Sequence, residues 1–435
     1  MVVYLPHILV VLLLILTLIK PKWAILVYIG SLGWIPVGLA QNIYGNLDFE
    51  DITLFVAALA GLIVIVLSPK RCWTTFTKIA LAYWLFSVVG NLVGLTKNPY
   101  VFDAVCRQMS KDFSLLLLFV ALSGCLQDVA YFRKTVAAIL IATIGVVVSV
   151  YIGRFFPDVA IIHYWAIRTY TVVDRSAGMF VNTYLAGVYI AVGISIFVAQ
   201  YFFVRSSFQW KKPLLIGMSL VYGIAILYGQ SRASYLTVAI VILMGSLSRV
   251  RNVIWGTLLV GVICIAILTN PILLEKAIGR FEGVDVSSLG GRVDSWRIWL
   301  GSMDDIGFIL GNGFQYSALR SGIGGHSSYL EAYTDGGILG LIAFLAFWPA
   351  VLRARKRIMT SFLSDSDKAN GLAFCWCAVG LLVSSAMIGL LTDTYYRTIF
   401  MTVLTVALSP CLVAACRMPQ KIAWRSPVML RKATQ

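Results

Sequence analysis

The sequence predicts an all-α fold, a polytopic bundle of helices integral to a membrane. Of its 435 residues, 60% are hydrophobic and only 12% are charged, and the mean hydropathy is +0.87. A soluble domain carries roughly 25% charged residues. Apolar runs of about 16 to 23 residues recur between short connections, which is the length of helix that crosses a bilayer. Helices satisfy their own backbone hydrogen bonds in lipid, and the short alternating segments of a membrane barrel are not seen.

The apolar runs give the expected elements in order. The first, from Tyr4 to Ile19, lacks a basic start and a small-residue cleavage site, so we expect a retained helix and not a removed signal peptide. Only Lys20-Pro21-Lys22 separates it from the second run, and the two could form a hairpin. We therefore expect about 12 (12–13) transmembrane helices in a single membrane domain, residues 1–435. The candidate ranges are 4–19, 23–40, 52–67, 78–95, 112–127, 135–153, 178–204, 213–229, 232–247, 253–269, 328–352, 371–391 and 397–416.

Basic residues predict the orientation of the bundle, because short cytoplasmic loops are enriched in Lys and Arg. The connections expected on the cytoplasmic side hold 22 of the 35 basic residues and 3 of the 19 acidic residues. The net charge of +16 is therefore a sign of membrane orientation and gives no indication of nucleic-acid binding. The same assignment places the polar segment 270–327 on the outer side, as one large loop carrying short amphipathic helices. The cytoplasmic connections are Lys20–Lys22, Pro69–Lys78, Gln127–Lys134, Arg205–Lys212, Ser248–Arg251, Arg353–Lys368 and the carboxy-terminal tail.

The eight cysteines are scattered, several within apolar runs, and show no paired framework and no metal-ligand spacing. We expect them to be packing residues and expect no metal or other cofactor. Acidic residues gather at Asp48, Glu50 and Asp51 in the first outer loop. Three neighbouring carboxylates could bind a divalent cation, but such sites need several converging oxygens, so we expect a solvated acidic loop.

His326 is the first residue with a possible chemical role. It follows Gly324-Gly325 and precedes a predicted helix that begins near Ser327. An imidazole, whose ordinary pKa lies near neutrality, suits proton abstraction from a hydroxyl. A helix-entry histidine bonded to a backbone carbonyl would have the same sequence signature.

Arg292 lies at the start of a predicted amphipathic helix, Val293 to Met303. The apolar stripe of this helix predicts that it lies flat on the membrane surface. An arginine at its amino end is well placed for a phosphate group, because guanidinium forks and free backbone N–H groups both bind phosphate oxygens. An arginine that reaches toward lipid headgroups is the structural alternative. The stripe consists of Trp296, Trp299, Leu300 and Met303.

Arg232 stands at the outer mouth of a tight helical hairpin, where Gln230-Ser231-Arg232 separates two apolar runs. An ionisable group so close to the bilayer is a functional candidate, although a boundary arginine could simply mark the turn. Arg175 lies just before the predicted span 178–204, which the chain enters from the outer side. Asn182 lies in the first turns of a long span, where it could bind a substrate or only a neighbouring helix.

Several short motifs follow one another between residues 175 and 400. They are Arg175 with Gly178 and Asn182, Gln230-Ser231-Arg232, Gly291-Arg292 with Trp296, Gly311-Asn312-Gly313, His326-Ser327-Ser328-Tyr329-Leu330, and Gly336-Gly337-Ile338-Leu339-Gly340. In order, spacing and outer placement, this set resembles the O-antigen ligase and O-antigen polymerase superfamily. Ser327 departs from it, because many relatives carry asparagine after the histidine. This difference affects the choice of subfamily more than that of superfamily.

The resemblance implies a C-type membrane glycosyltransferase in the bacterial inner (cytoplasmic) membrane, with an active site that faces the periplasm. For an O-antigen ligase, it implies transfer of O-antigen polysaccharide from undecaprenyl pyrophosphate to a sugar hydroxyl of lipid A–core in lipopolysaccharide biosynthesis. It further implies that Arg232 and Arg292 bind the donor pyrophosphate, with Arg175 and Asn182 also at the substrate site. His326 would activate the acceptor hydroxyl, and neither metal nor nucleotide would be needed.

This chemistry agrees with the residue types. Two fixed guanidinium groups can neutralise a leaving pyrophosphate without a metal. Attack from the opposite side of the anomeric carbon, with the histidine as base, inverts the product in one step, so no carboxylate nucleophile is needed. The alternatives in the same superfamily are an O-antigen polymerase and a protein O-oligosaccharyltransferase. A secondary transporter is the alternative from a different class, but the polar candidates gather at the outer face and no internal repeat is evident.

Overall fold

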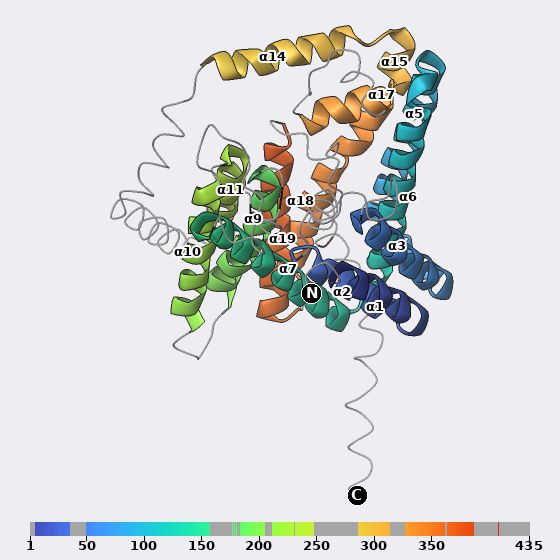
Figure 1. Ribbon diagram of the computed structural model, residues 1–435. Helices are drawn as coiled ribbons and strands as arrows, with labels where there is room; N and C mark the ends of the chain where they lie inside the picture. The colour runs from blue at the N-terminus through green and yellow to red at the C-terminus, as the bar shows by residue number, and fades with distance from the viewer. Residues whose placement is uncertain are drawn as a thin grey trace, which may run out of the picture.

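The computed structural model describes residues 5–34, 49–156, 176, 178, 180, 183–204, 211–229, 231–247, 286–313, 327–361, 363–386 and 408. These residues form helices joined by turns, and no strand occurs among them (Figure 1). The expected all-α fold is confirmed for this part of the chain. The helices are α1 Leu5–Ile19, α2 Pro21–Ser31, α3 Phe49–Leu67, α4 Pro69–Cys72, α5 Thr75–Lys97, the 3-10 helix η3 Pro99–Val101, α6 Phe102–Cys125, α7 Val129–Phe155, α9 Thr183–Phe203, α10 Lys211–Gly229, α11 Arg232–Leu247, α14 Val286–Gly301, α15 Asp305–Leu310, α17 Ser328–Leu345, α18 Phe347–Met359 and α19 Asp365–Ser384.

The number of spanning helices differs from the expectation. Among the described residues, six helical stretches are long and apolar enough to cross a membrane: α3, α5, α7, α9, α10 and Ser328–Met359, which joins α17 and α18. A bilayer core needs about 20 helical residues. Apolar α1 and α11 are shorter than this, and α6 and α19 begin with charged residues. The fold is that of a multi-pass helical membrane protein, but the count of about 12 spans is not supported. The expected ranges 253–269 and 397–416 lie outside the described residues, apart from Leu408.

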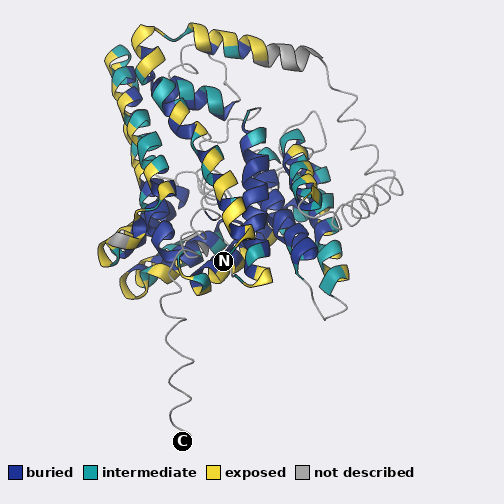
Figure 2. Cartoon of the chain, turned by 180° about the vertical axis from the view of Figure 1, so that it is seen from behind, coloured by how far each residue is buried: buried dark blue, intermediate teal, exposed yellow. Residues whose placement is uncertain are grey.

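Helix α9 is the most buried of these helices and packs against α7, α10, α11 and α19. Small residues let its neighbours approach closely, as is usual where helices pack in lipid. A Cβ atom at Gly193 would lie 2.2 Å from the ring of Tyr222 in α10. The Tyr222 hydroxyl is hydrogen-bonded to Thr143 of α7 at 3.0 Å. Figure 2 shows buried residues in the centre of the bundle and exposed residues along α14 and α15.

A second group of helices, α3, α5, α6 and α17, packs together, and α2 and α18 contact both groups. Helix α17 is broken at Gly337, whose backbone angles are φ 66° and ψ −164°. Glycine is required there, because the left-handed region disfavours other residues and a Cβ atom would lie 2.1 Å from the Ile309 carbonyl oxygen. The first half of α17 is thus a separate short helix that begins directly after the segment containing His326.

Connections that the charge pattern assigns to the cytoplasmic side meet at one end of the bundle. The Tyr131 hydroxyl donates to the Lys22 carbonyl oxygen at 3.0 Å. The side chain of Gln127 donates to the Arg71 carbonyl oxygen at 2.6 Å. These contacts join three of the basic connections, as an orientation with one basic end requires.

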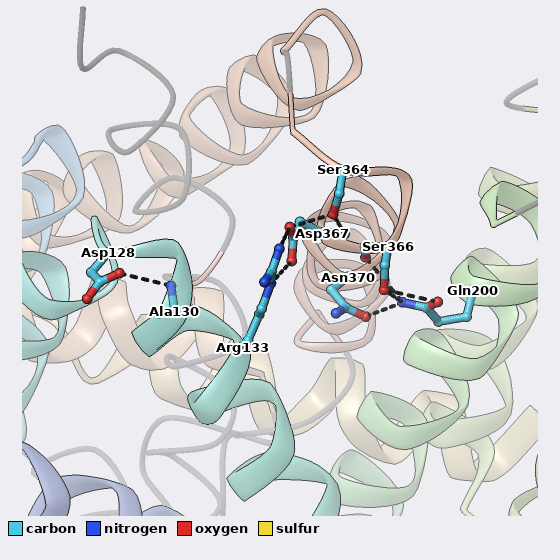
Figure 3. Close-up of polar contacts among 8 residues, drawn as sticks. All are labelled: Asp128, Ala130, Arg133, Gln200, Ser364, Ser366, Asp367 and Asn370. Atoms are coloured by element: carbon cyan, nitrogen blue, oxygen red, sulfur yellow. Dashed lines mark hydrogen bonds and ion pairs between the residues drawn. The ribbon is translucent and has the colours of Figure 1, made fainter. Parts of the chain in front are cut away.

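Polar side chains hold α7, α9 and α19 together at this same end (Figure 3). The Nε and Nη2 atoms of Arg133 donate to the two carboxylate oxygens of Asp367 at 2.8 and 2.7 Å. Gln200 donates to the Asn370 side-chain oxygen at 2.7 Å. Such fork-shaped pairs are among the stronger polar contacts in proteins, so α19 is fixed at its first turn.

The acidic cluster near the amino terminus is not the solvated loop that we expected. Glu50 and Asp51 lie in the first turn of α3 and are buried, and Asp51 forms a 2.7 Å ion pair with the equally buried Lys111 of α6. A buried carboxylate requires such a partner, and this partner is distant in sequence. Asp48 lies outside the described residues.

Candidate functional site

The expected site residues differ in how far the structure describes them. Arg232 is the first residue of α11 and is half-buried. Arg292 lies within α14, and its side chain is outside the description. Arg175, Asn182 and His326 lie outside the described residues. Their described neighbours Ser176, Thr183 and Ser327 show which elements lie next to these positions.

The carboxyl end of α19 connects two helices: α11, which begins with Arg232, and α17, which begins two residues after His326. The hydroxyl of Ser384 donates to the carbonyl oxygen of Ala233, the residue after Arg232, at 3.0 Å. The carbonyl oxygen of the next residue, Ser385, accepts the backbone N–H of Ser328 at 2.8 Å. The last residue of α19 and the residue after it therefore hold the first turns of α11 and α17 next to each other.

The start of α11 is also fixed against α9. The Ser231 hydroxyl accepts the hydroxyl of Ser234 at 2.9 Å, and the Ser234 backbone N–H lies at 3.4 Å. A Cβ atom at Gly187 of α9 would lie 1.7 Å from the Ser234 hydroxyl oxygen. The two helices thus touch at this point, and only glycine fits.

The segment after Arg175 reaches the same end of the bundle. The backbone N–H of Ser176 donates to the Tyr228 carbonyl oxygen at 3.0 Å, and its hydroxyl donates to the Val150 carbonyl oxygen at 2.7 Å. Tyr228 lies four residues before Arg232, at the end of α10. Ser176, the residue after Arg175, therefore lies against the hairpin of α10 and α11, whose turn precedes Arg232.

Helices α14 and α15 belong to the polar segment 270–327, and α14 lies across one end of the bundle (Figure 1). We call residues 286–313, which contain both helices, the arm. Helix α14 begins at Val286, not at Val293. Arg292 is therefore not at the amino end of the helix. The prediction that free backbone N–H groups next to Arg292 help to bind a phosphate is wrong.

The predicted apolar stripe of α14 is divided between two environments. Trp299 is 3% exposed, with Ser295 also buried, whereas Leu300 is 49% exposed. One edge of the stripe therefore faces the protein, where α14 contacts α17. The other edge faces outward. The expectation that α14 lies flat on a membrane surface stays a prediction.

Asp304 and Lys97 connect the arm to the bundle. The Lys97 ammonium at the end of α5 lies 2.7 Å from the carboxylate of Asp304. The same carboxylate accepts the backbone N–H of Gly307 at 2.7 Å and so caps α15. The hydrogen bond from Lys97, and then that from Gly307, lower the pKa of the Asp304 carboxyl below its ordinary value.

Neither a protein-family model nor a curated protein matches this sequence. The superfamily resemblance therefore rests on the short motifs alone. Within the described residues, no group of three or more His, Cys, Asp or Glu side chains is arranged to hold a metal ion.

Sequence reasoning did not identify Ser384 and Ser385 as part of the site. They lie inside an apolar run, 371–391, which we expected to continue as one span, but α19 ends at Ser384. Adjacent serines in an apolar run are a weak signal of a helix end, because their hydroxyls compete for backbone groups. Lys97 was counted only as a loop charge, although it is a specific contact of the arm.

Proposed function

We propose that this protein is a membrane glycosyltransferase of the O-antigen ligase type. It would transfer O-antigen polysaccharide from undecaprenyl pyrophosphate to a sugar hydroxyl of lipid A–core at the periplasmic face of the inner membrane. One observation supports this proposal above the others: Ser384 and Ser385 hold the helix that begins with Arg232 next to the helix that begins after His326. A cation for the leaving group and a base for the acceptor are needed close together in such a reaction.

In the proposed reaction the acceptor oxygen forms a bond to the anomeric carbon as the bond from that carbon to the phosphate oxygen breaks. The electron pair of the broken bond leaves with undecaprenyl pyrophosphate, whose charge Arg232 and Arg292 neutralise. The proton of the acceptor hydroxyl passes to the His326 imidazole. Attack from the face opposite the leaving group inverts the anomeric configuration.

Arg175 and Asn182 have supporting roles in this proposal. The contact between Ser176 and Tyr228 comes directly after Arg175 in sequence and lies next to the Arg232 hairpin, which supports a third guanidinium group near the donor. Asn182 directly precedes Thr183, the first residue of α9. An amide at that position can donate to and accept from sugar hydroxyls.

A deletion strain tests the proposed function. Without the protein, polymerised glycan should remain on undecaprenyl pyrophosphate and be absent from lipid A–core. Single repeat units on lipid A–core would instead indicate a polymerase, and loss of glycan from a protein would indicate a protein O-oligosaccharyltransferase. A transporter would be indicated by two results together. The lipopolysaccharide pattern would be unchanged, and the purified protein would carry a solute across the membrane of vesicles.

A further inference from the structure

The Gly311-Asn312-Gly313 turn has no part in the proposed chemistry, yet three elements meet there. Asn312 is 1% exposed. Its backbone N–H donates to the Thr334 carbonyl oxygen of α17 at 2.7 Å, and its side-chain oxygen accepts the Lys97 ammonium of α5. Its side-chain nitrogen lies 3.4 Å from the Met303 sulfur, between α14 and α15. A single buried residue therefore links the arm to α5 through its side chain and to α17 through its backbone N–H.

Glycines bring the backbones at this joint into direct contact. A Cβ atom at Gly94 of α5 would lie 2.1 Å from the Asn312 carbonyl oxygen. A Cβ atom at Gly90 would lie 1.7 Å from the carbonyl oxygen of Asp335, next to the break in α17. Gly311 has φ 85°, which favours glycine. At these glycines the backbones leave no room for a side chain.

Lys97 supplies the charge that closes the joint. It lies in the last turn of α5, where a cation also interacts favourably with the helix dipole. It contacts both Asp304 and Asn312. Because Asp304 caps α15, this one ammonium group holds the start of α15 and the turn that follows it.

We propose that Lys97 and Asn312 are positioning residues of the transferase, which hold the arm on α5 and α17. Arg292 lies in α14 of the arm, and His326 precedes α17. The joint therefore fixes the arm, which contains Arg292, relative to α17, the helix that follows His326 in sequence. This role rests on the proposed function, whereas the docking of the arm can be tested without it.

The test compares the full chain with Lys97→Met, Lys97→Arg and Arg297→Met in lipid nanodiscs. Lys97→Met keeps the side-chain length and removes the charge. Arg297→Met is the matched control, because Arg297 pairs only weakly with Asp294 at 3.5 Å within α14 and both are exposed. Amide hydrogen exchange of residues 303–313 reports docking of the arm, and exchange of residues 371–384 reports the integrity of the bundle.

In Lys97→Met we expect exchange in the arm to become about tenfold faster, with no change in α19. The KM for the lipid-linked donor should rise about tenfold and kcat should also fall, because a displaced Arg292 binds the donor and neutralises the leaving group less well. Lys97→Arg should restore most of both properties. Arg297→Met should resemble the wild type. If Lys97→Met does not fold, Asn312→Ser, whose shorter side chain cannot reach Lys97, takes its place with the same expectations.

Unchanged exchange in the arm would overturn the docking role of Lys97. Faster exchange with a lowered kcat and an unchanged KM would overturn its positioning of the donor site. If the wild-type protein transfers no glycan, the proposed function fails and the catalytic part of the inference fails with it. The exchange comparison then still decides whether the joint holds the arm.

Discussion

Thr237 of α11 and Ser384 of α19 share a hydrogen bond between their hydroxyl oxygens, 2.7 Å apart. Both side chains are buried, and a Cβ atom at Gly380, one turn earlier in α19, would lie 2.8 Å from the Thr237 methyl group. The Ser384 hydroxyl also donates to the Ala233 carbonyl oxygen, so it makes two hydrogen bonds with α11. One hydroxyl group of α19 therefore supports both Ala233 and Thr237 of α11 next to the candidate site.

Ser384→Ala should lower both stability and transfer activity. The substitution removes a hydrogen bond to the Ala233 carbonyl and one to the Thr237 hydroxyl, which then keep their own 3.0 Å hydrogen bond to each other, so each loss costs about 0.5–1.5 kcal/mol. Ser219→Ala is the matched control, because the buried Ser219 hydroxyl donates to the Leu215 carbonyl oxygen within its own helix, α10. Thermal unfolding and single-turnover transfer should be measured on both. An equal effect of the two substitutions would contradict the role of Ser384.

Arg232→Ala and Arg292→Ala should each weaken donor binding as well as turnover. Each removes charge-assisted hydrogen bonds to the pyrophosphate, which are worth about 1.5–3 kcal/mol in binding. Lysine should rescue only in part, since it keeps the charge and loses the planar fork. Donor affinity is measured by titration of purified variants with undecaprenyl-pyrophosphate glycan. Unchanged affinity in both alanine variants would rule out the phosphate clamp.

His326→Ala should leave donor affinity nearly intact and reduce turnover at least about 10²-fold, as expected for loss of a general base. Wild-type turnover should fall as the pH drops through the imidazole pKa, about 6.5 for an unperturbed histidine. A variant that transfers glycan at nearly the wild-type rate would exclude the base assignment.

Docking of the arm should have a different pH dependence from turnover. The folded-state pKa of Asp304 lies below its ordinary value, so its contribution to docking is present above the unfolded-state pKa of about 3.9 and is lost as the pH falls through the lowered value. Amide exchange in residues 303–313, corrected for the intrinsic pH dependence of exchange, should therefore show constant protection between about pH 8 and pH 5. Loss of protection near pH 6.5 would mean that the arm, and not only His326, responds to histidine titration.

The long apolar helices could be predicted from sequence because their signal is local. The runs that become α3, α5, α7, α9 and α10 are bounded by charges or prolines, and composition alone predicts a helix there. Helix α14 was predicted to begin too late, because Gly290-Gly291 favours a break at a cost of about 1 kcal/mol per glycine. The structure continues the helix through both glycines.

The candidate site could be predicted as a set of residue types but not as an arrangement. Ser384 bonds to Ala233, and Lys97 bonds to Asp304, across long stretches of sequence. No local pattern predicts such pairs. The burial of Asp51 was missed for the same reason, since its partner Lys111 belongs to another helix.

The orientation of the bundle is the last prediction, and it determines on which side of the membrane the site lies. Single cysteines at Ser287 and Ser317 should react with an impermeant thiol reagent added to the periplasmic side, whereas one at Ser366 should not. Ser366 is exposed and contacts Gln200 at the end of the bundle where the basic connections meet. It therefore tests sidedness and not burial.

The native Cys106 is exposed near the start of α6, within the connection 96–111, which we expect on the outer side. It should react in the unmodified chain, and all eight native cysteines must be replaced by serine before the single cysteines are compared. If Ser366→Cys is the only one of these variants that reacts in intact cells, the bundle has the opposite orientation. Arg232, Arg292 and His326 would then lie on the cytoplasmic side.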